Sequence, residues 1–268
     1  MTLKTLITLI ALSAALQASA YTYKLAFTED FKGTQLNSKI WERIPAGKPD
    51  WCKHMDDKNP ALVKLRGGTL ELWGLKNKDK RDPRPFTTGG IMTKHHLGMM
   101  YGKIEAKVKF HDQQGAWPAI WMMPIKQPKG WPHDGEIDIV ERLNGDDFVY
   151  QTVHSGYTQV NPGNPPHGGR GKFKKDDWNL FAIEWTPESI TWFVNGKATF
   201  SYKKFDDDPA HYPWTAPFYL MLDMQLQGNW VGKVNVDTLP VKMEIDFVKF
   251  YALYDDKGVK LTKFTRGK

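Results

Sequence analysis

Three carboxylates fall within six positions of an otherwise apolar segment, residues 135–141, which reads Gly-Glu-Ile-Asp-Ile-Val-Glu. Side chains of a β-strand alternate between two faces, so Glu136 and Asp138 share one face. Strict alternation would put Glu141 on the opposite face, but one extra residue, a β-bulge at positions 139–140, returns it to the acidic face. The segment therefore predicts a bulged strand that presents three acids together.

Two carboxyl groups that reach the same sugar are the machinery of a glycosidase. With the bulge, Glu136 and Glu141 are effectively four positions apart, roughly 13 Å between backbones at about 3.3 Å per residue, and on a concave surface their long side chains can lean together. Retaining enzymes hold the two carboxyls about 5–5.5 Å apart and inverting enzymes about 6.5–9.5 Å apart, so the short spacing favours retention. An exposed acidic strand face and a calcium site are the alternative interpretations.

The three acids are assigned distinct catalytic roles. Like charges raise one another's pKa, which keeps one carboxyl protonated near neutrality, as a general acid requires. We expect Glu136 to attack the anomeric carbon and Glu141 to protonate the leaving oxygen and later activate water. We expect Asp138 to hold Glu136 and tune the shared proton.

Tryptophans near the acids are candidates for sugar binding, because flat aromatic rings cover the apolar faces of sugars. Trp117, Trp121 and Trp131 all lie within twenty residues before Glu136. Trp131 is the leading candidate and Trp117 the next, whereas Trp121 fits equally well in the core. Two further candidates for the cleft are Trp51 and Trp230.

The elements that would position these residues are short strands. Alternating patterns and turn residues recur along the chain, and no long amphipathic helix is predicted. Residues 195–196 read Asn-Gly between two alternating segments, which indicates a tight hairpin. Strands are expected at Val63–Leu65, Thr69–Leu75, Ile91–Thr93, Tyr101–Phe110, Ile137–Glu141, Val149–His154, Asn179–Trp185, Ile190–Val194, Ala198–Tyr202, Phe218–Gln225 and Val241–Ala252. This pattern predicts an all-β protein, an antiparallel sandwich or jelly roll.

Three segments are expected to be loops: Asn77–Phe86, Val160–Lys175 and Phe205–Pro217. The second contains several prolines and glycines and follows the strand next to the acidic motif. Long loops are uncommon unless they are functional, so Val160–Lys175 is predicted to form one lip of the cleft. A surface excursion without a role is the alternative.

The chain resembles glycoside hydrolase family 16, whose bulged signature is Glu-x-Asp-x-x-Glu, from about Phe27 to Tyr251. Further segments resemble laminarinase-type members and occur in the expected order: Tyr101-Gly-Lys-Ile-Glu-Ala-Lys, Gly115-Ala-Trp-Pro-Ala-Ile-Trp-Met-Met-Pro124, Trp131-Pro-His-Asp-Gly-Glu136, Ala182-Ile-Glu-Trp-Thr-Pro187 and Gly228-Asn-Trp230. The resemblance implies two curved sheets whose concave face carries the substrate cleft. It also implies an endo-acting β-glycosidase.

Several positions refine the site that the resemblance implies. Family members commonly have a histidine at the position of His154, near the acids; it either hydrogen-bonds a carboxylate or sugar hydroxyl, or is a satisfied core histidine. A structural Ca²⁺, as in laminarinase-like relatives, would use Asp246 and backbone carbonyls. No cofactor is expected to be required.

The substrate is left open between two classes of β-linked chain. Where laminarinase-like chains read Gly-Gly-Asn-Trp, this chain has Gln227 in place of the first glycine, with Gln225 two residues before it. Both glutamines are expected on one strand face as candidates for the cleft, and they cast doubt on a plain β-1,3-glucan. Residues 150–157, together with Asp50 and Trp51, resemble members that cut galactose and N-acetylglucosamine chains.

Composition limits the other functions. Lys4, the apolar run Leu6–Leu16 and a small-residue site at 18–20 predict a secretory signal over residues 1–20, followed by one catalytic domain over 21–268. The apolar run is shorter than the about 20 residues needed to span a bilayer, so no stable membrane anchor is expected. Cys52 is the only cysteine, so no internal disulfide is expected. The net charge is +7, but the basic residues form no dense run, so nucleic acid binding is not expected.

The sequence therefore predicts an exported monomer, periplasmic or extracellular, whose partner is a polysaccharide or oligosaccharide. Two alternatives remain. A transglycosylase would use the same acids to pass the sugar to another glycan, although such family members usually carry the motif without the bulge. A non-catalytic glycan-binding jelly roll would not need the acids at all.

Overall fold

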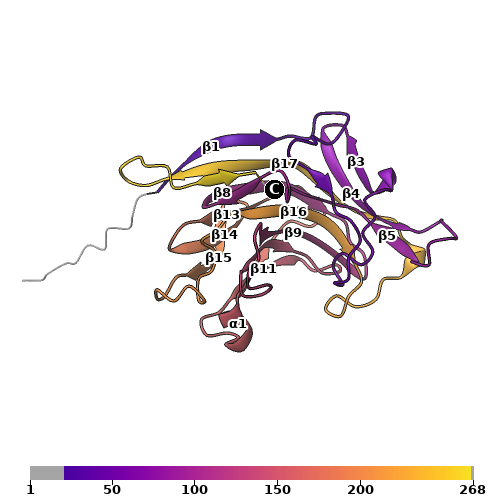
Figure 1. The fold of residues 1–268 in the computed structure, drawn as a ribbon. Coiled ribbons are helices and arrows are strands. Elements are labelled where there is room, and N and C mark those ends of the chain that lie inside the picture. Colours follow the sequence, from indigo (N-terminus) through magenta and orange to yellow (C-terminus); the bar gives the residue numbers. More distant parts are fainter. Residues whose placement is uncertain (1–20, 267–268) are drawn as a thin grey trace, which may run out of the picture.

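The computed structural model describes residues 21–266, which form two antiparallel sheets stacked in two layers (Figure 1). In order across the first sheet lie β15 (Lys197–Lys203), β14 (Ser189–Val194), β13 (Asn179–Trp185), β8 (Gly102–Phe110), β17 (Val241–Tyr254), β4 (Thr69–Lys76) and β3 (Val63–Arg66). At the side of this path, β1 (Thr22–Glu29) pairs with β17 and β5 (Phe86–Thr88) pairs with β4. The jelly-roll sandwich predicted from the sequence is confirmed.

The second sheet carries the acidic strand in its interior. In order it contains β12 (Gly168–Lys172), β11 (Phe148–His154), β10 (Glu136–Glu141), β9 (Ala116–Pro124), β16 (Phe218–Leu226), β6 (Gly90–Met92) and β2 (Glu42–Arg43). Two further strands extend it, because β7 (Gly98–Met100) pairs with β16, and β18 (Lys263–Thr265) pairs with β7. The described helices are short: α1 (Gly156–Val160) and the 3₁₀ turns η1 (Pro60–Leu62) and η2 (Val236–Thr238).

The main hydrophobic core lies between the two sheets, and strand alternation explains it. In β8, Ile104, Ala106 and Val108 are buried, while the lysines and the glutamate between them are partly exposed. In β16 every residue is buried, because one face joins this core and the other is covered as well. Burial of the alternating apolar side chains stabilises the sandwich by about 25 cal/mol per Å² of apolar surface.

The side of the second sheet that faces away from the first sheet is called the cleft face. A second, smaller apolar cluster covers part of it. Tyr219 and Met221 of β16 pack there with Trp121 of β9 and with Ile44 and Met55 from the segment after β2. This segment folds over the sheet and closes one side of the concave surface. The cleft face is therefore partly buried even though it lies outside the main core.

The expected strands all occur, with end points shifted by one or two residues, but the prediction of a continuous loop over Val160–Lys175 is wrong. Residues 168–172 form β12, which pairs with β11 at the edge of the second sheet. Its glycines explain the difference, because a Cβ at Gly169 would lie 2.6 Å from Phe200 Cβ and one at Gly171 would lie 2.5 Å from Val194 Cγ2. Only glycine lets this strand pack so closely on β14 and β15.

Other strands were not predicted, notably β9. Its residues form a nearly continuous apolar run that contains two prolines, so it lacks the period-two pattern of a half-exposed strand. The predicted secretory signal, residues 1–20, lies outside the described residues. None of the described helices has the length and apolar character needed to cross a bilayer.

Candidate active site

The acidic strand β10 contains the predicted bulge. Its pairing with β9 shifts register between Asp138 and Val140, and its pairing with β11 shifts between Asp138 and Glu141. Buried indoles hold the backbone from the core side: Trp192 Nε1 donates to Asp138 O at 2.8 Å and Trp214 Nε1 donates to Glu136 O at 3.0 Å. The bulge therefore brings Glu141 to the face that carries Glu136 and Asp138.

All three acids line one cleft of about 500 Å³ on the cleft face. Strands β9, β10 and β16 form its floor, and the segments 49–51 and 127–131 contribute its walls. The residues that line it are Pro49, Trp51, Trp117, Trp121, Met123, Gln127, Trp131, Glu136, Asp138, Glu141, Tyr219 and Gln225. Five of these residues are aromatic, and the carboxyl groups all come from β10.

Glu136 lies at the start of β10 beneath Trp131. The indole Nε1 of Trp131 donates to Glu136 Oε2 at 2.6 Å, while the ring itself remains 54% exposed. Burial and the negative charge of Asp138 raise the pKa of Glu136 to about 8, and His154 and the Trp131 hydrogen bond partly oppose that rise. Trp131 therefore both supports the carboxylate and offers a free ring face to a sugar.

Glu141 is buried at the other end of the acidic group, and Trp117 Nε1 donates to its Oε1 at 2.9 Å. Burial, together with the charge of Asp138, raises the pKa of Glu141 well above its usual value, and the Trp117 hydrogen bond offsets only part of this. This environment favours the protonated form of the carboxyl, which a general acid requires. The pKa of Glu136 is raised as well, but the charge of His154 partly opposes that rise, whereas no cation is among the groups that shift the pKa of Glu141. This difference favours Glu136 over Glu141 as the nucleophile.

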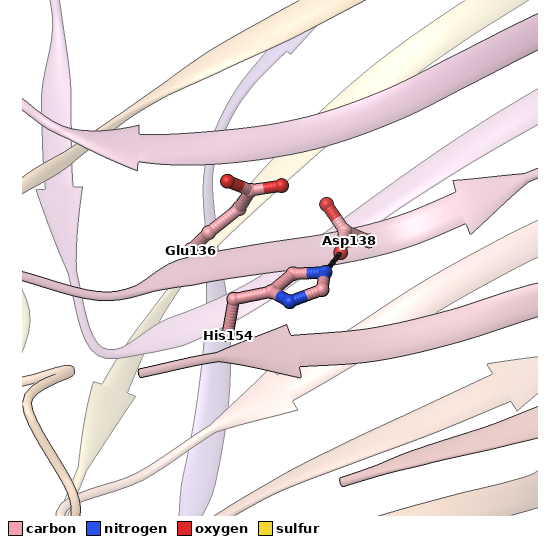
Figure 2. A group of neighbouring side chains, drawn as sticks. All are labelled: Glu136, Asp138 and His154. Atoms are coloured by element: carbon pink, nitrogen blue, oxygen red, sulfur yellow. Dashed lines mark ion pairs between the residues drawn. The ribbon is translucent and has the colours of Figure 1, made fainter. Parts of the chain in front are cut away.

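His154 lies beside Asp138 on the neighbouring strand β11 (Figure 2). Its Nε2 is 3.2 Å from Asp138 Oδ2, and Gln159 contacts its Nδ1 at 3.1 Å from the other side. Burial would lower the pKa of His154, but the adjacent Asp138 and the charge of Glu136 raise it to about 9. The imidazolium therefore compensates the negative charge of Asp138.

The predicted tryptophans fall at different places in the cleft. Trp117, Trp121, Trp131 and Trp51 line it, and Trp121 is buried and packs edge-on against Trp51 at 4.7 Å between ring centroids. Trp230 does not line this cleft but packs against Trp117 at 5.5 Å and is exposed. The aromatic surface thus continues outward from the cleft at Trp230.

Residues on β11 and β12 extend that aromatic surface, and the sequence analysis did not single them out as site residues. Tyr150 of β11 packs against Trp230 at 4.9 Å between centroids. The guanidinium of Arg170, in the unpredicted strand β12, lies 5.1 Å over the ring of Tyr150. Part of the segment expected to form a lip therefore borders the aromatic surface as a strand.

The two glutamines separate. Gln225 lines the cleft and is buried, whereas Gln227 follows the end of β16 in a left-handed conformation with φ of 62° and is not among the lining residues. The prediction that both share one strand face is wrong, because β16 ends at Leu226. The sequence analysis also missed Asp223, a fully buried acid two residues before Gln225. The available signal was the spacing, because residues two apart in a strand point to the same face.

The calcium prediction concerns the other sheet. Asp246 of β17 forms an ion pair with Lys107, with Oδ2 and Nζ 2.7 Å apart. A cation at this carboxylate would have to compete with the ammonium group. The calcium site stays a prediction.

Fold and cleft together define the class: a jelly roll with an aromatic cleft and paired acids is built to act on sugar chains. Residues 54–249 match the family model of Glycosyl hydrolases family 16, and the chain belongs to that family. The keratan-sulfate endo-1,4-beta-galactosidase of Sphingobacterium multivorum is 31% identical over 235 residues, which cover 86% of this chain and 56% of that protein. The chain thus spans little more than half the length of this relative.

Two solved structures show the same architecture. The laminarinase from Rhodothermus marinus superposes with a TM-score of 0.77 at 27% identity, covering 86% of this chain and 98% of the laminarinase. A structure described as "Prominent members of the human gut microbiota express endo-acting O-glycanases to initiate mucin breakdown" gives a TM-score of 0.75 at 26% identity, covering 85% and 98% of the two chains. Relatives of this chain therefore include both a laminarinase and an endo-galactosidase.

Proposed function

We propose that the protein is an endo-acting β-glycosidase that hydrolyses internal linkages of a glycan with retention of anomeric configuration. The observation that carries this proposal is the bulge in β10, which places Glu136 and Glu141 on one face with Asp138 between them. The open cleft supports an endo mode of attack, because a chain can pass through it without presenting an end.

The proposed reaction takes two displacements. The Glu136 carboxylate attacks the anomeric carbon, and as the glycosidic bond breaks, the leaving oxygen takes the proton of Glu141. Water then loses a proton to Glu141 and attacks the same carbon, which releases the Glu136 carboxylate. Asp138 lies between the two glutamates, and its negative charge favours the protonated form of each.

For the substrate we propose a chain of the galactose and N-acetylglucosamine type ahead of a plain β-1,3-glucan. Two relatives support this choice: the keratan-sulfate endo-galactosidase and the structure described with mucin O-glycanases. Gln225 at the floor of the cleft adds a polar group, where a plain apolar floor would suit stacked glucose rings. The predicted signal over residues 1–20 leads us to propose that the protein acts outside the cytoplasm.

The experiment is to incubate the purified protein with laminarin, mixed-linkage glucan, agar-type galactan, keratan sulfate and mucin glycans and to size the products. Proton NMR of the earliest product then reads the anomeric configuration. We expect oligosaccharides of β configuration from keratan sulfate or mucin glycans. An α product at early times would reject retention, chain-lengthened products would favour transglycosylation, and no release from any glycan would reject the enzymatic function.

A second experiment assigns the two glutamates. In Glu136→Ala the cavity left behind admits azide, which attacks the anomeric carbon from the nucleophile's side and yields an α-glycosyl azide. In Glu141→Ala the glycosyl intermediate on Glu136 still forms with an activated aryl glycoside, and azide then yields the β-glycosyl azide. The opposite pair of products would exchange the two roles.

A further inference from the structure

A buried hydrogen-bond acceptor lies at the floor of the cleft without a partner. Gln225 is 2% exposed and lines the cleft, yet its Oε1 accepts no hydrogen bond from the described residues. A buried polar atom left unpaired costs about 1–3 kcal/mol. A donor supplied by a bound glycan would remove that cost.

The orientation of the Gln225 amide is set by a second buried residue, Asp223. Gln225 Nε2 donates to Asp223 Oδ1 at 2.8 Å, and Trp121 Nε1 donates to Asp223 Oδ2 at 3.0 Å. When Asp223 is ionised, both of its oxygens can only accept, so the amide must turn its NH₂ group toward Asp223 and its oxygen away.

Packing locks Asp223 in this position. It is fully buried, and a Cβ on Gly90 of the neighbouring strand would lie 2.7 Å from Asp223 Cβ. On the other side of β16, β9 pairs Trp117 with Gln225, and the indole of Trp117 supports Glu141. Gln225 therefore pairs with the residue whose indole supports the proposed acid/base, and it lines the same cleft as Glu141.

We propose that Gln225 is a specificity-determining residue: its Oε1 accepts a hydrogen bond from the 4-hydroxyl of a galactose or from an acetamido N–H of the glycan, and Asp223 holds the amide in the orientation that presents this oxygen. The inference rests on the proposed β-glycosidase function and deepens it. It explains why an acid and an amide occupy a strand face that otherwise carries Tyr219 and Met221.

The test measures kcat/KM on an N-acetyllactosamine oligomer and on two analogues. One lacks the 4-hydroxyl of galactose, and the other carries a hydroxyl in place of the acetamido group. Assays are run above the pKa of Asp223, which burial raises to about 7. We expect Gln225→Ala to lower kcat/KM on the parent oligomer about 10- to 100-fold.

The two analogues identify which glycan group donates to Gln225. On the analogue that lacks the donor group, kcat/KM of wild type and of Gln225→Ala should differ by less than about twofold, because the hydrogen bond is already absent. On the other analogue, Gln225→Ala should lower kcat/KM as much as it does on the parent oligomer. Equal losses on all three substrates would assign Gln225 a purely structural role and overturn the proposal, as would no loss on any of them.

Asp223→Asn provides a nearly isosteric second variant. The Trp121 N–H can only donate, so the new amide must turn its oxygen toward Trp121 and its NH₂ toward Gln225. The Gln225 amide then reverses and presents a donor to the cleft, and the loss should match that of Gln225→Ala. Thermal unfolding confirms that each variant folds, and Gln35→Ala, at an exposed position outside the cleft, is the matched control.

Failure of this inference differs from failure of the proposed function. If wild type releases no oligosaccharide from any glycan, the proposed function is rejected. If wild type cleaves a glycan but Gln225→Ala and Asp223→Asn retain its selectivity among the analogues, only the role of Gln225 is rejected.

Discussion

Neighbouring positions on the two faces of the second sheet are equally buried but have opposite chemistry. Toward the first sheet, Ile137 of β10 and Leu222 of β16 are 0% exposed and belong to the main core. Toward the cleft, Asp138 and Asp223 of the same strands are 1% and 0% exposed. Apolar burial stabilises the fold, whereas burial of acids destabilises it and shifts their pKa values. One face therefore maintains the sandwich and the other is suited to chemistry.

Tryptophan side chains offset the cost of burying acids on the cleft face. An indole N–H is a donor only, which suits a carboxylate that can only accept. Trp131, Trp117 and Trp121 each donate to an acid of the cleft face: Glu136, Glu141 and Asp223 respectively. Their rings also line the cleft, so the same side chains reduce the cost of burying the acids and provide apolar surface for a sugar.

The strongest test of the cleft face is Glu136→Gln, which keeps the size of the side chain. We expect kcat/KM to fall by at least about 10⁴-fold, because a covalent route without its nucleophile loses the whole displacement. Steady-state kinetics and circular dichroism measure activity and fold. The exposed variant Glu188→Gln is the control, and activity retained within about tenfold would contradict the assignment of Glu136.

The matching test of the core face is Ile137→Ala, one residue further along β10. Removing a fully buried isoleucine should lower the free energy of unfolding by about 2–5 kcal/mol. Urea denaturation measures this loss, and Leu25→Ala, at a position 55% exposed, is the control. If Ile137→Ala cost no more stability than Leu25→Ala, the two faces of β10 would not differ as described.

A pH series of stability distinguishes the faces without kinetics. The pKa of Glu136 is raised from 4.5 to about 8, so its proton is held more tightly in the folded state. The contribution of protonated Glu136 to the free energy of unfolding is fully present below pH 4.5 and is lost as the pH rises through about 8. Glu136→Gln should therefore be more stable than wild type above that range, on the order of 1–3 kcal/mol, and equal to it in acid.

This difference is read from urea midpoints of the two proteins across the pH range. Glu188→Gln, which removes an exposed carboxylate, should follow wild type throughout. A wild-type protein that is the more stable of the pair at high pH would show that the fold depends on the ionised Glu136.

The smallest effect is expected for Trp131→Phe, which keeps a ring but removes the N–H donated to Glu136. We expect kcat to fall about tenfold, corresponding to one hydrogen bond to a charged group, with little change in KM. Trp131→Ala should in addition raise KM, because the stacking surface is lost. Trp178→Phe, whose ring lies by Lys107 of the first sheet, is the control. An unchanged kcat in Trp131→Phe would limit Trp131 to stacking.

Particular residues show where prediction from sequence works and where it stops. The bulge was predictable, because Glu141 lies one position out of phase with Glu136 and Asp138 in an apolar run. Strand β12 was not, because its glycines carry no strand signal and only the approach of Phe200 and Val194 requires them. The separation of Gln225 from Gln227 likewise depended on where β16 ends.

The amino-acid sequence by itself determined the sandwich, the acidic strand and the tryptophans near it, because period-two patterns and close spacing along the chain are local properties. Only the tertiary structure decided which indole supports which carboxylate, that His154 lies against Asp138, and that Asp223 orients Gln225 at the cleft floor. Two of these contacts join residues on different strands: Trp117 with Glu141, and His154 with Asp138. Their geometry depends on sheet register and on packing between distant segments, which no local pattern encodes.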